Sequence, residues 1–194
     1  MPPRFTPYIL LTLVSLLVGG FVGYAIRAYQ PTPLSPYVEQ LDSPVRGLST
    51  QEVDDLLKGR GAGYARTAEL NNYPGPRHLL DFAAPLDLAP SQIETLEGVF
   101  SDMQAKAQAL GTDIVEAEAI LSASFADTDI SDESLNVQIR DLADLYGQLR
   151  VIHLQAHLRS RALLTYDQVT RYNELRGYDQ AASNNESESH HNNH

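Results

Sequence analysis

Two long runs of apolar residues, spaced alternately three and four positions apart, restrict most of this chain to helical structure. The first run is Ile93, Leu96, Phe100, Met103, Ala107, Leu110, Ile114, Ala117 and Leu121. The second is Leu135, Ile139, Leu142, Tyr146, Leu149, His153, Ala156, Ser160 and Leu163. Such spacing places each run along one face of an α-helix, as in a coiled-coil seam. The polar segment 123–132 between them is turn-like, so we expect a long antiparallel helical hairpin.

A helix-start signal follows the second run. Thr165 can accept a hydrogen bond from the backbone N–H of Gln168, whose side chain can reach back to the backbone of Thr165. This capping box predicts a last helix from Tyr166 to about Arg176. Gly177 suits its C-terminal end.

A related signal precedes the first run, in the segment 88–92. Pro90 suits the first position of a helix, and Gln92 keeps the spacing of a capping box. Ala89 stands where a capping hydroxyl would be, so this copy is weaker. The two signals flank the predicted hairpin.

The chain before the hairpin contains shorter elements. Four prolines make 27–48 an extended linker. Ser49 and Glu52 indicate a capping box for a helix at 49–58, which the Gly-rich segment 59–63 ends as a flexible joint. A second short helix is expected at 78–82, within a region of short helices that spans 49–84. Because no segment alternates with a period of two, the predicted fold class is all-α.

The N-terminal part is of a different kind. Residues 8–26 carry no charge and nearly span a hydrocarbon core of about 30 Å. We expect one N-terminal transmembrane helix at 8–26, with 1–7 in the cytoplasm and the rest in the periplasm. A cleaved signal peptide is the alternative, although its apolar core is usually only about 7–15 residues long.

Charge and composition exclude some functions. The formal net charge of −11 argues against nucleic-acid binding. Because the chain has no cysteine, a metal site must use histidine, carboxylates or the thioether of Met103. No nucleophile with a positioned base and oxyanion donors can be identified, so we do not expect an enzyme.

His153 and His157 are the main candidate site residues. Side chains four positions apart lie on the same face of a helix, so both imidazoles can reach one ion. Folding the hairpin near residue 129 brings Glu97 within one or two turns of them, and His78 can return there from the short helix before the hairpin. This mixed nitrogen and oxygen set suits zinc, nickel, cobalt or copper(II). The alternative is that His153 is a packed core histidine.

The two glutamine motifs, the His-x-x-x-His pair and the N-terminal apolar segment together resemble the Spy/CpxP family of periplasmic proteins. The resemblance covers residues 74–178 and is best over 151–178. The family includes zinc-resistance-associated proteins and heavy-metal sensors of the CnrX type. It implies homodimers or larger assemblies, and its sensor branch implies a membrane anti-sigma factor as partner. Its Spy branch implies a periplasmic holdase that binds unfolded client proteins.

The sequence therefore predicts a protein of the bacterial inner membrane that carries a hairpin domain at 85–178 and a disordered tail at 179–194. The leading function is metal binding in heavy-metal sensing, heavy-metal resistance or the envelope stress response. The alternatives are a holdase chaperone and a structural interaction module. In the tail, His190, His191 and His194 form a second histidine cluster, which either binds metal modestly or only adds solubility.

Overall fold

The structure, a computed structural model, describes residues 34–43, 45–128 and 130–178. The chain divides into two compact units, 1–38 and 39–194. The described residues of the first unit, 34–38, are exposed. The predicted membrane anchor at 8–26 and the histidines of the tail lie outside the described residues. Among the helices that are described, none is both long and apolar enough to cross a membrane.

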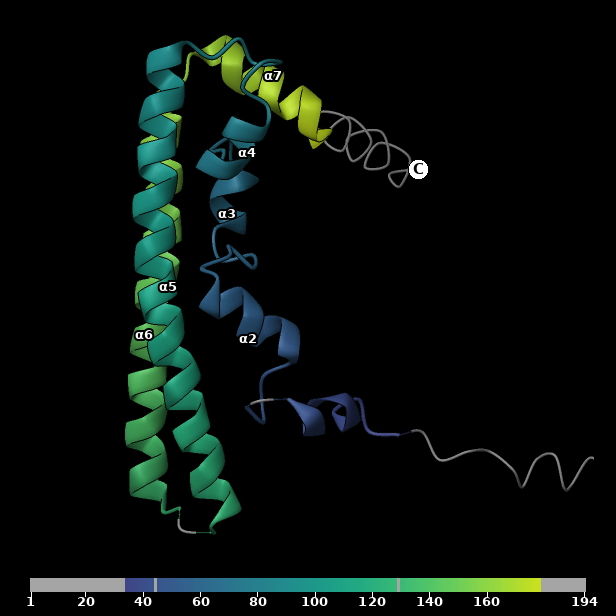
Figure 1. Ribbon diagram of the computed structural model, residues 1–194, viewed down its shortest axis with the longest axis vertical. Helices are drawn as coiled ribbons and strands as arrows, with labels where there is room; N and C mark the ends of the chain where they lie inside the picture. The colour runs from purple at the N-terminus through teal and green to yellow at the C-terminus, as the bar shows by residue number, and fades with distance from the viewer. Residues whose placement is uncertain (1–33, 44, 129, 179–194) are drawn as a thin grey trace, which may run out of the picture. The chain divides into compact units, whose positions relative to one another are not determined.

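Every regular element in the described ranges is a helix, which confirms the all-α prediction for this part of the chain (Figure 1). The elements are a 3₁₀ helix η1 (Val38–Asp42), α2 (Thr50–Leu57), α3 (Arg66–Glu69), α4 (Pro76–Asp81), α5 (Pro90–Ala126), α6 (Asp132–Arg161) and α7 (Tyr166–Arg176). The sequence predicted the starts of α2 and α7 correctly, since both capping boxes form. The helix α5 continues to Ala126, into the segment expected to be a turn.

The two longest helices, α5 and α6, lie side by side (Figure 1). Three contacts fix their relative order: Gln138 donates to Ser124 at 3.3 Å, Tyr146 donates to Glu118 at 3.1 Å, and Arg159 pairs with Asp102 at 2.9 Å. Because later positions in α6 meet earlier positions in α5, the two helices run in opposite directions.

The buried face of each long helix follows the predicted seam only in part. In α6 the buried positions are all seam residues: Leu142, Leu149, His153, Ala156 and Ser160. In α5, Val99 and Gly111 are also buried although they lie outside the seam. The reason is that α5 also packs against α2 and α4, which widens its covered face. Ile139 of the α6 seam is 47% exposed, because none of the described helices covers that end of the pair.

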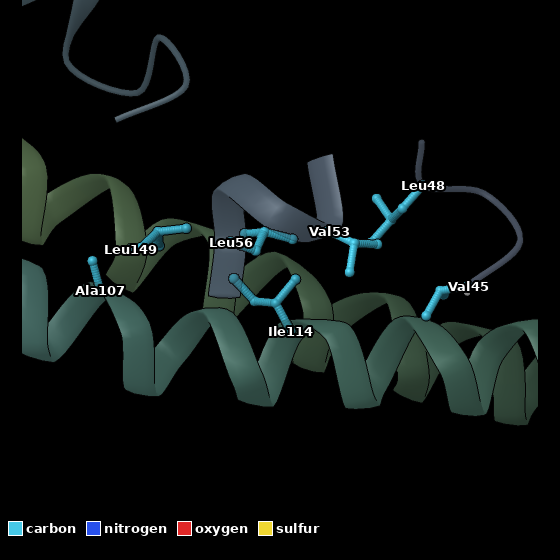
Figure 2. Close-up of a cluster of buried hydrophobic side chains, with 7 residues drawn as sticks. All are labelled: Val45, Leu48, Val53, Leu56, Ala107, Ile114 and Leu149. Carbon is cyan, nitrogen blue, oxygen red and sulfur yellow. The ribbon is translucent and has the colours of Figure 1, made fainter. Parts of the chain in front are cut away.

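A hydrophobic cluster joins α2 to the long helices (Figure 2). Its members are Val45, Leu48, Val53, Leu56, Ala107, Ile114 and Leu149. Val45 and Leu48 belong to the segment expected to be an extended linker, yet both are buried here. The segment before α2 therefore contributes to the core.

A second cluster lies where α5 begins and α6 ends. It contains Leu79, Leu86, Leu88, Leu96, Leu164, Val169 and Tyr172.

Two glutamines fix this end of the molecule. The amide nitrogen of Gln92 donates to Gln168 Oε1 at 3.0 Å, and that of Gln168 donates to Gln92 Oε1 at 3.2 Å. Gln92 Oε1 also accepts the backbone N–H of Ala89 at the start of α5. In the same way, Gln168 Oε1 accepts the backbone N–H of Thr165 at the start of α7.

Glycine at position 111 allows the backbone of α2 to approach α5 closely. A Cβ atom added at Gly111 would lie 2.0 Å from the backbone oxygen of Leu56. Gly59, which has φ +62°, is similarly close, with Gln104 O 2.8 Å from its Cβ position. The short distance between α2 and α5 thus depends on the absence of side chains at these two positions.

We expect Gly111→Ala to destabilise the fold by about 1–3 kcal/mol, because the new methyl group must push α2 away from α5. Gly98→Ala is the matched control, since Gly98 lies in the same helix with open space around its Cβ position. That change should stabilise the protein by up to about 1 kcal/mol through helix propensity. Urea unfolding of the full chain measures both effects, and equal midpoints for the two variants would contradict the packing argument.

Candidate functional site

The helix α6 presents His153 toward the core. Its side chain is 2% exposed, and its Nε2 atom has no hydrogen-bond partner among the described residues. The ring stacks on Tyr64, with 5.7 Å between the ring centroids and 9° between the planes. A buried nitrogen without a partner is unusual, because desolvation of such a group is unfavourable. This atom therefore needs an explanation beyond packing.

Burial also sets the protonation state of His153. Removal of the ring from water and, to a smaller extent, the nearby His157 together lower the pKa of His153 from 6.5 to about 4. At neutral pH the imidazole is therefore uncharged. A neutral imidazole with a free nitrogen is the form that binds transition metals.

His157 lies one turn further along α6, and its ring contacts the segment that precedes α4. Its Nδ1 atom is 2.7 Å from the backbone oxygen of Tyr73. Because a carbonyl oxygen only accepts, Nδ1 carries a proton, and in the neutral ring the lone pair is then on Nε2. The ring rests against Gly75, where an added Cβ would lie 2.8 Å from Nε2. Gly75 thus leaves the space that the His157 ring occupies.

The carboxylate of Glu69, at the end of α3, organises the surroundings of His157. Glu69 Oε2 lies 3.8 Å from His157 Nδ1 and accepts the Gly75 N–H at 3.2 Å. Glu69 Oε1 accepts from the hydroxyls of Tyr172 and Tyr178. Burial and this carboxylate raise the pKa of Tyr172 well above its ordinary value. The hydroxyl therefore remains a donor across the physiological range.

A cavity of about 880 Å³ opens beside these residues. We call it the histidine cavity, because His78, His153 and His157 all contribute to its lining. His78, on α4, has a side chain that is 45% exposed and that lies 3.9 Å from Asp81. Burial is the main cause that lowers the pKa of His78. Three of the four residues predicted from the sequence thus border one space.

The fourth predicted residue, Glu97, is exposed on α5 and does not line the histidine cavity. Within residues 34–43, 45–128 and 130–178, no three His, Cys, Asp or Glu side chains are arranged closely enough to hold a metal ion. The three histidines are therefore neighbours of one cavity without forming a closed coordination shell in this arrangement.

Sequence reasoning missed Glu69 and the main-chain partner of His157. Glu69 lies in a polar stretch with no periodic pattern, and its neighbours Tyr172 and Tyr178 follow it by about a hundred positions. Nothing local distinguishes this glutamate from a solvated one. The Gly75 position gave one usable signal, since it lies in the Pro-Gly-Pro turn that precedes α4.

We expect the low pKa of His153 to appear as a pH-dependent loss of stability. Between pH 6.5 and about 4, the unfolded chain binds a proton at His153 that the folded chain does not bind. Stability from this residue is therefore complete above pH 6.5 and decreases as the pH falls, by up to about 3 kcal/mol.

The control is His153→Phe, which keeps an aromatic ring against Tyr64 and removes the titrating group. Urea unfolding from pH 7 to pH 4.5 should show a smaller loss of stability in the variant than in the native chain. Equal losses in the two proteins would refute the assignment.

Comparison of this chain with protein-family models, with curated proteins and with solved structures found no match. Its function must therefore be inferred from the chemistry of its own residues.

Proposed function

We propose that this protein binds a divalent transition metal through His153 and His157, as a membrane-anchored component of envelope metal sensing or metal resistance. One observation supports this most directly. The buried Nε2 of His153 has no partner, and His153 lines the same cavity as His157 and His78. A metal ion would give this nitrogen the partner that it lacks.

The environment of His157 supports the same proposal. Metal-binding histidines commonly donate their second ring N–H to a backbone oxygen or a carboxylate, which fixes the tautomer and the ring orientation. His157 donates Nδ1–H to Tyr73 O, with Glu69 close by. In this proposal Glu69 is a positioning residue. The proposed ligands are His153, His157 and His78, and Glu97 is left out because it lies away from the cavity.

Zinc, nickel, cobalt and copper(II) are the proposed metals, because imidazole nitrogen suits all four. A metal bound to α4 and α6 together would favour one packing of the predicted hairpin formed by α5 and α6. His78 would have to move toward the α6 histidines for this shell to close. The difference in packing is what a membrane regulator, such as an anti-sigma factor, would recognise.

The family resemblance, the periplasmic location and the homodimer belong to the same proposal. They depend on the glutamine motifs and on the apolar segment 8–26. In the structure the two motifs meet, because Gln92 and Gln168 form hydrogen bonds with each other.

Calorimetric titration with zinc, nickel, cobalt and copper(II) tests the proposed site. The protein is the full chain with His190, His191 and His194 changed to Asn, so that only the remaining histidines can bind. We expect one ion per chain, and we expect His153→Ala/His157→Ala to abolish binding because it removes two of the three ligands.

Gln148→Ala, an exposed change on the same helix, is the control and should bind like the parent. Circular dichroism of each variant establishes that α-helix content is retained. Failure of all four metals to bind the parent protein, or equal binding by the double variant, would refute the proposal.

One observation favours a holdase as a second candidate function. Four large apolar residues near the α5–α6 connection are exposed by about half: Ile120, Phe125, Val137 and Ile139. Exposed apolar side chains that gather at one end of a molecule can bind unfolded chains.

We expect serine at these four positions to reduce the suppression of client aggregation while metal binding is unchanged, because the four residues lie apart from the histidine cavity. Light scattering of a denatured client with the full chain measures the effect. The matched control is Val151→Ser/Leu158→Ser, which changes two exposed apolar residues elsewhere on α6. Equal suppression by both variants would argue against a client surface at the α5–α6 connection.

A further inference from the structure

The histidine cavity is much larger than a metal ion needs. Its volume of about 880 Å³ falls in the range of about 300–1,000 Å³ that is typical of pockets for organic ligands. The described residues also supply too few ligands to surround an ion. A metal bound here through histidine would keep coordination positions open toward the empty part of the cavity.

The charges that line the cavity are unexpected in an acidic protein. Five cationic side chains contribute to its surface: Lys58, Arg60, Arg66, Arg77 and Arg176. The only acidic side chain in the lining is Glu69, which already accepts from two tyrosines and a backbone N–H. The lining therefore offers a ligand more cationic than anionic side chains.

Four of these cations have carboxylate partners, and of those partners only Glu69, which lies 3.7 Å from Arg176, belongs to the lining. Lys58 and Arg60 pair with Asp54, and Arg77 pairs with Asp81 at 3.2 Å. Arg66 differs, because it makes no ion pair among the described residues. It begins α3 beside the Gly-rich segment 59–63, with its Nη2 3.1 Å from the Cβ position of Gly63.

We infer that the metal occupies this cavity as an anionic complex with a small polycarboxylate, and not as a free ion. The inference rests on the proposed function and names the form of its ligand. The imidazoles of His153 and His157 bind the metal, and the carboxylates of the chelator fill its remaining positions. A free carboxylate of the chelator pairs with Arg66, whose guanidinium can donate two parallel hydrogen bonds.

The apolar part of the lining agrees with an organic partner. Phe100 and Met103 lie on this side of α5, and the Arg77 guanidinium stands over the Phe100 ring at 5.8 Å from its centroid. Carbon atoms of a chelator would contact these side chains while its carboxylates meet the cations. A hydrated ion alone would gain nothing from such contacts.

Calorimetry with nickel and citrate tests the inference on the full chain with His190, His191 and His194 changed to Asn. Nickel alone, citrate alone and a preformed 1:1 nickel–citrate complex are titrated separately. We expect the complex to bind at least about tenfold more tightly than nickel alone, the effect of one added charge-assisted contact. Citrate alone should bind more weakly than the complex.

Arg66→Gln should reduce the affinity for the complex to about that for nickel, and leave the affinity for nickel unchanged. Arg46→Gln is the matched control, because Arg46 is exposed and does not line the cavity. It should behave like the parent for both ligands.

The two proposals fail in different ways. If nickel binds through His153 and His157 but citrate removes it, the chelate inference is overturned and the metal site stands. If nickel does not bind in either form, the metal site itself is refuted. If the complex binds equally well to the His153→Ala/His157→Ala variant, the histidines do not hold the metal of the complex and the chelate inference is overturned, while the titration of this variant with nickel alone decides the metal site.

Discussion

The carboxylate of Glu69 is the interaction on which the arrangement around the cavity depends. It lies at the end of a helix of only four residues, yet it contacts residues from three other parts of the fold. It accepts from the hydroxyls of Tyr172 and Tyr178 and from the N–H of Gly75, and it lies 3.8 Å from the ring of His157. A short helix cannot maintain its own position, because few internal hydrogen bonds hold it together. The carboxylate attaches it to α4, α6 and α7 and thereby keeps one wall of the cavity in place.

This acidic chain concentrates positive charge at the cavity. Carboxylates outnumber cationic side chains over the whole sequence, by 25 to 14. In the cavity lining the proportion is reversed. Asp54 and Asp81 do not line the cavity themselves, but they form ion pairs with cationic side chains that do. Asp54 pairs with Lys58 and Arg60, and Asp81 pairs with Arg77, which helps to hold these groups near the cavity. The lining of the cavity therefore differs in its charge balance from the chain as a whole.

Local signals in the sequence were sufficient to predict the helices, and insufficient to predict the site. Ser49, Thr165 and Gln168 define helix starts through contacts with residues three positions away, so the pattern is visible in the chain itself. His153 was found because it continues a seam and has a second histidine one turn later. The position of Glu69 could not be predicted, because its partners are about a hundred residues distant. The cationic lining was missed for the same reason, since it collects residues from segments 58–66, 77 and 176.

The reciprocal amide pair of Gln92 and Gln168 has a consequence for local unfolding. These residues are 76 positions apart, and each side-chain oxygen caps its own helix while it accepts from the other glutamine. The first turn of α5 therefore cannot fray without removing a partner from the first turn of α7, and the reverse also holds. Ends of helices are normally the parts of a protein that open most easily. Here two such ends are joined into one cooperative unit, so their amide protons should exchange with solvent at related rates.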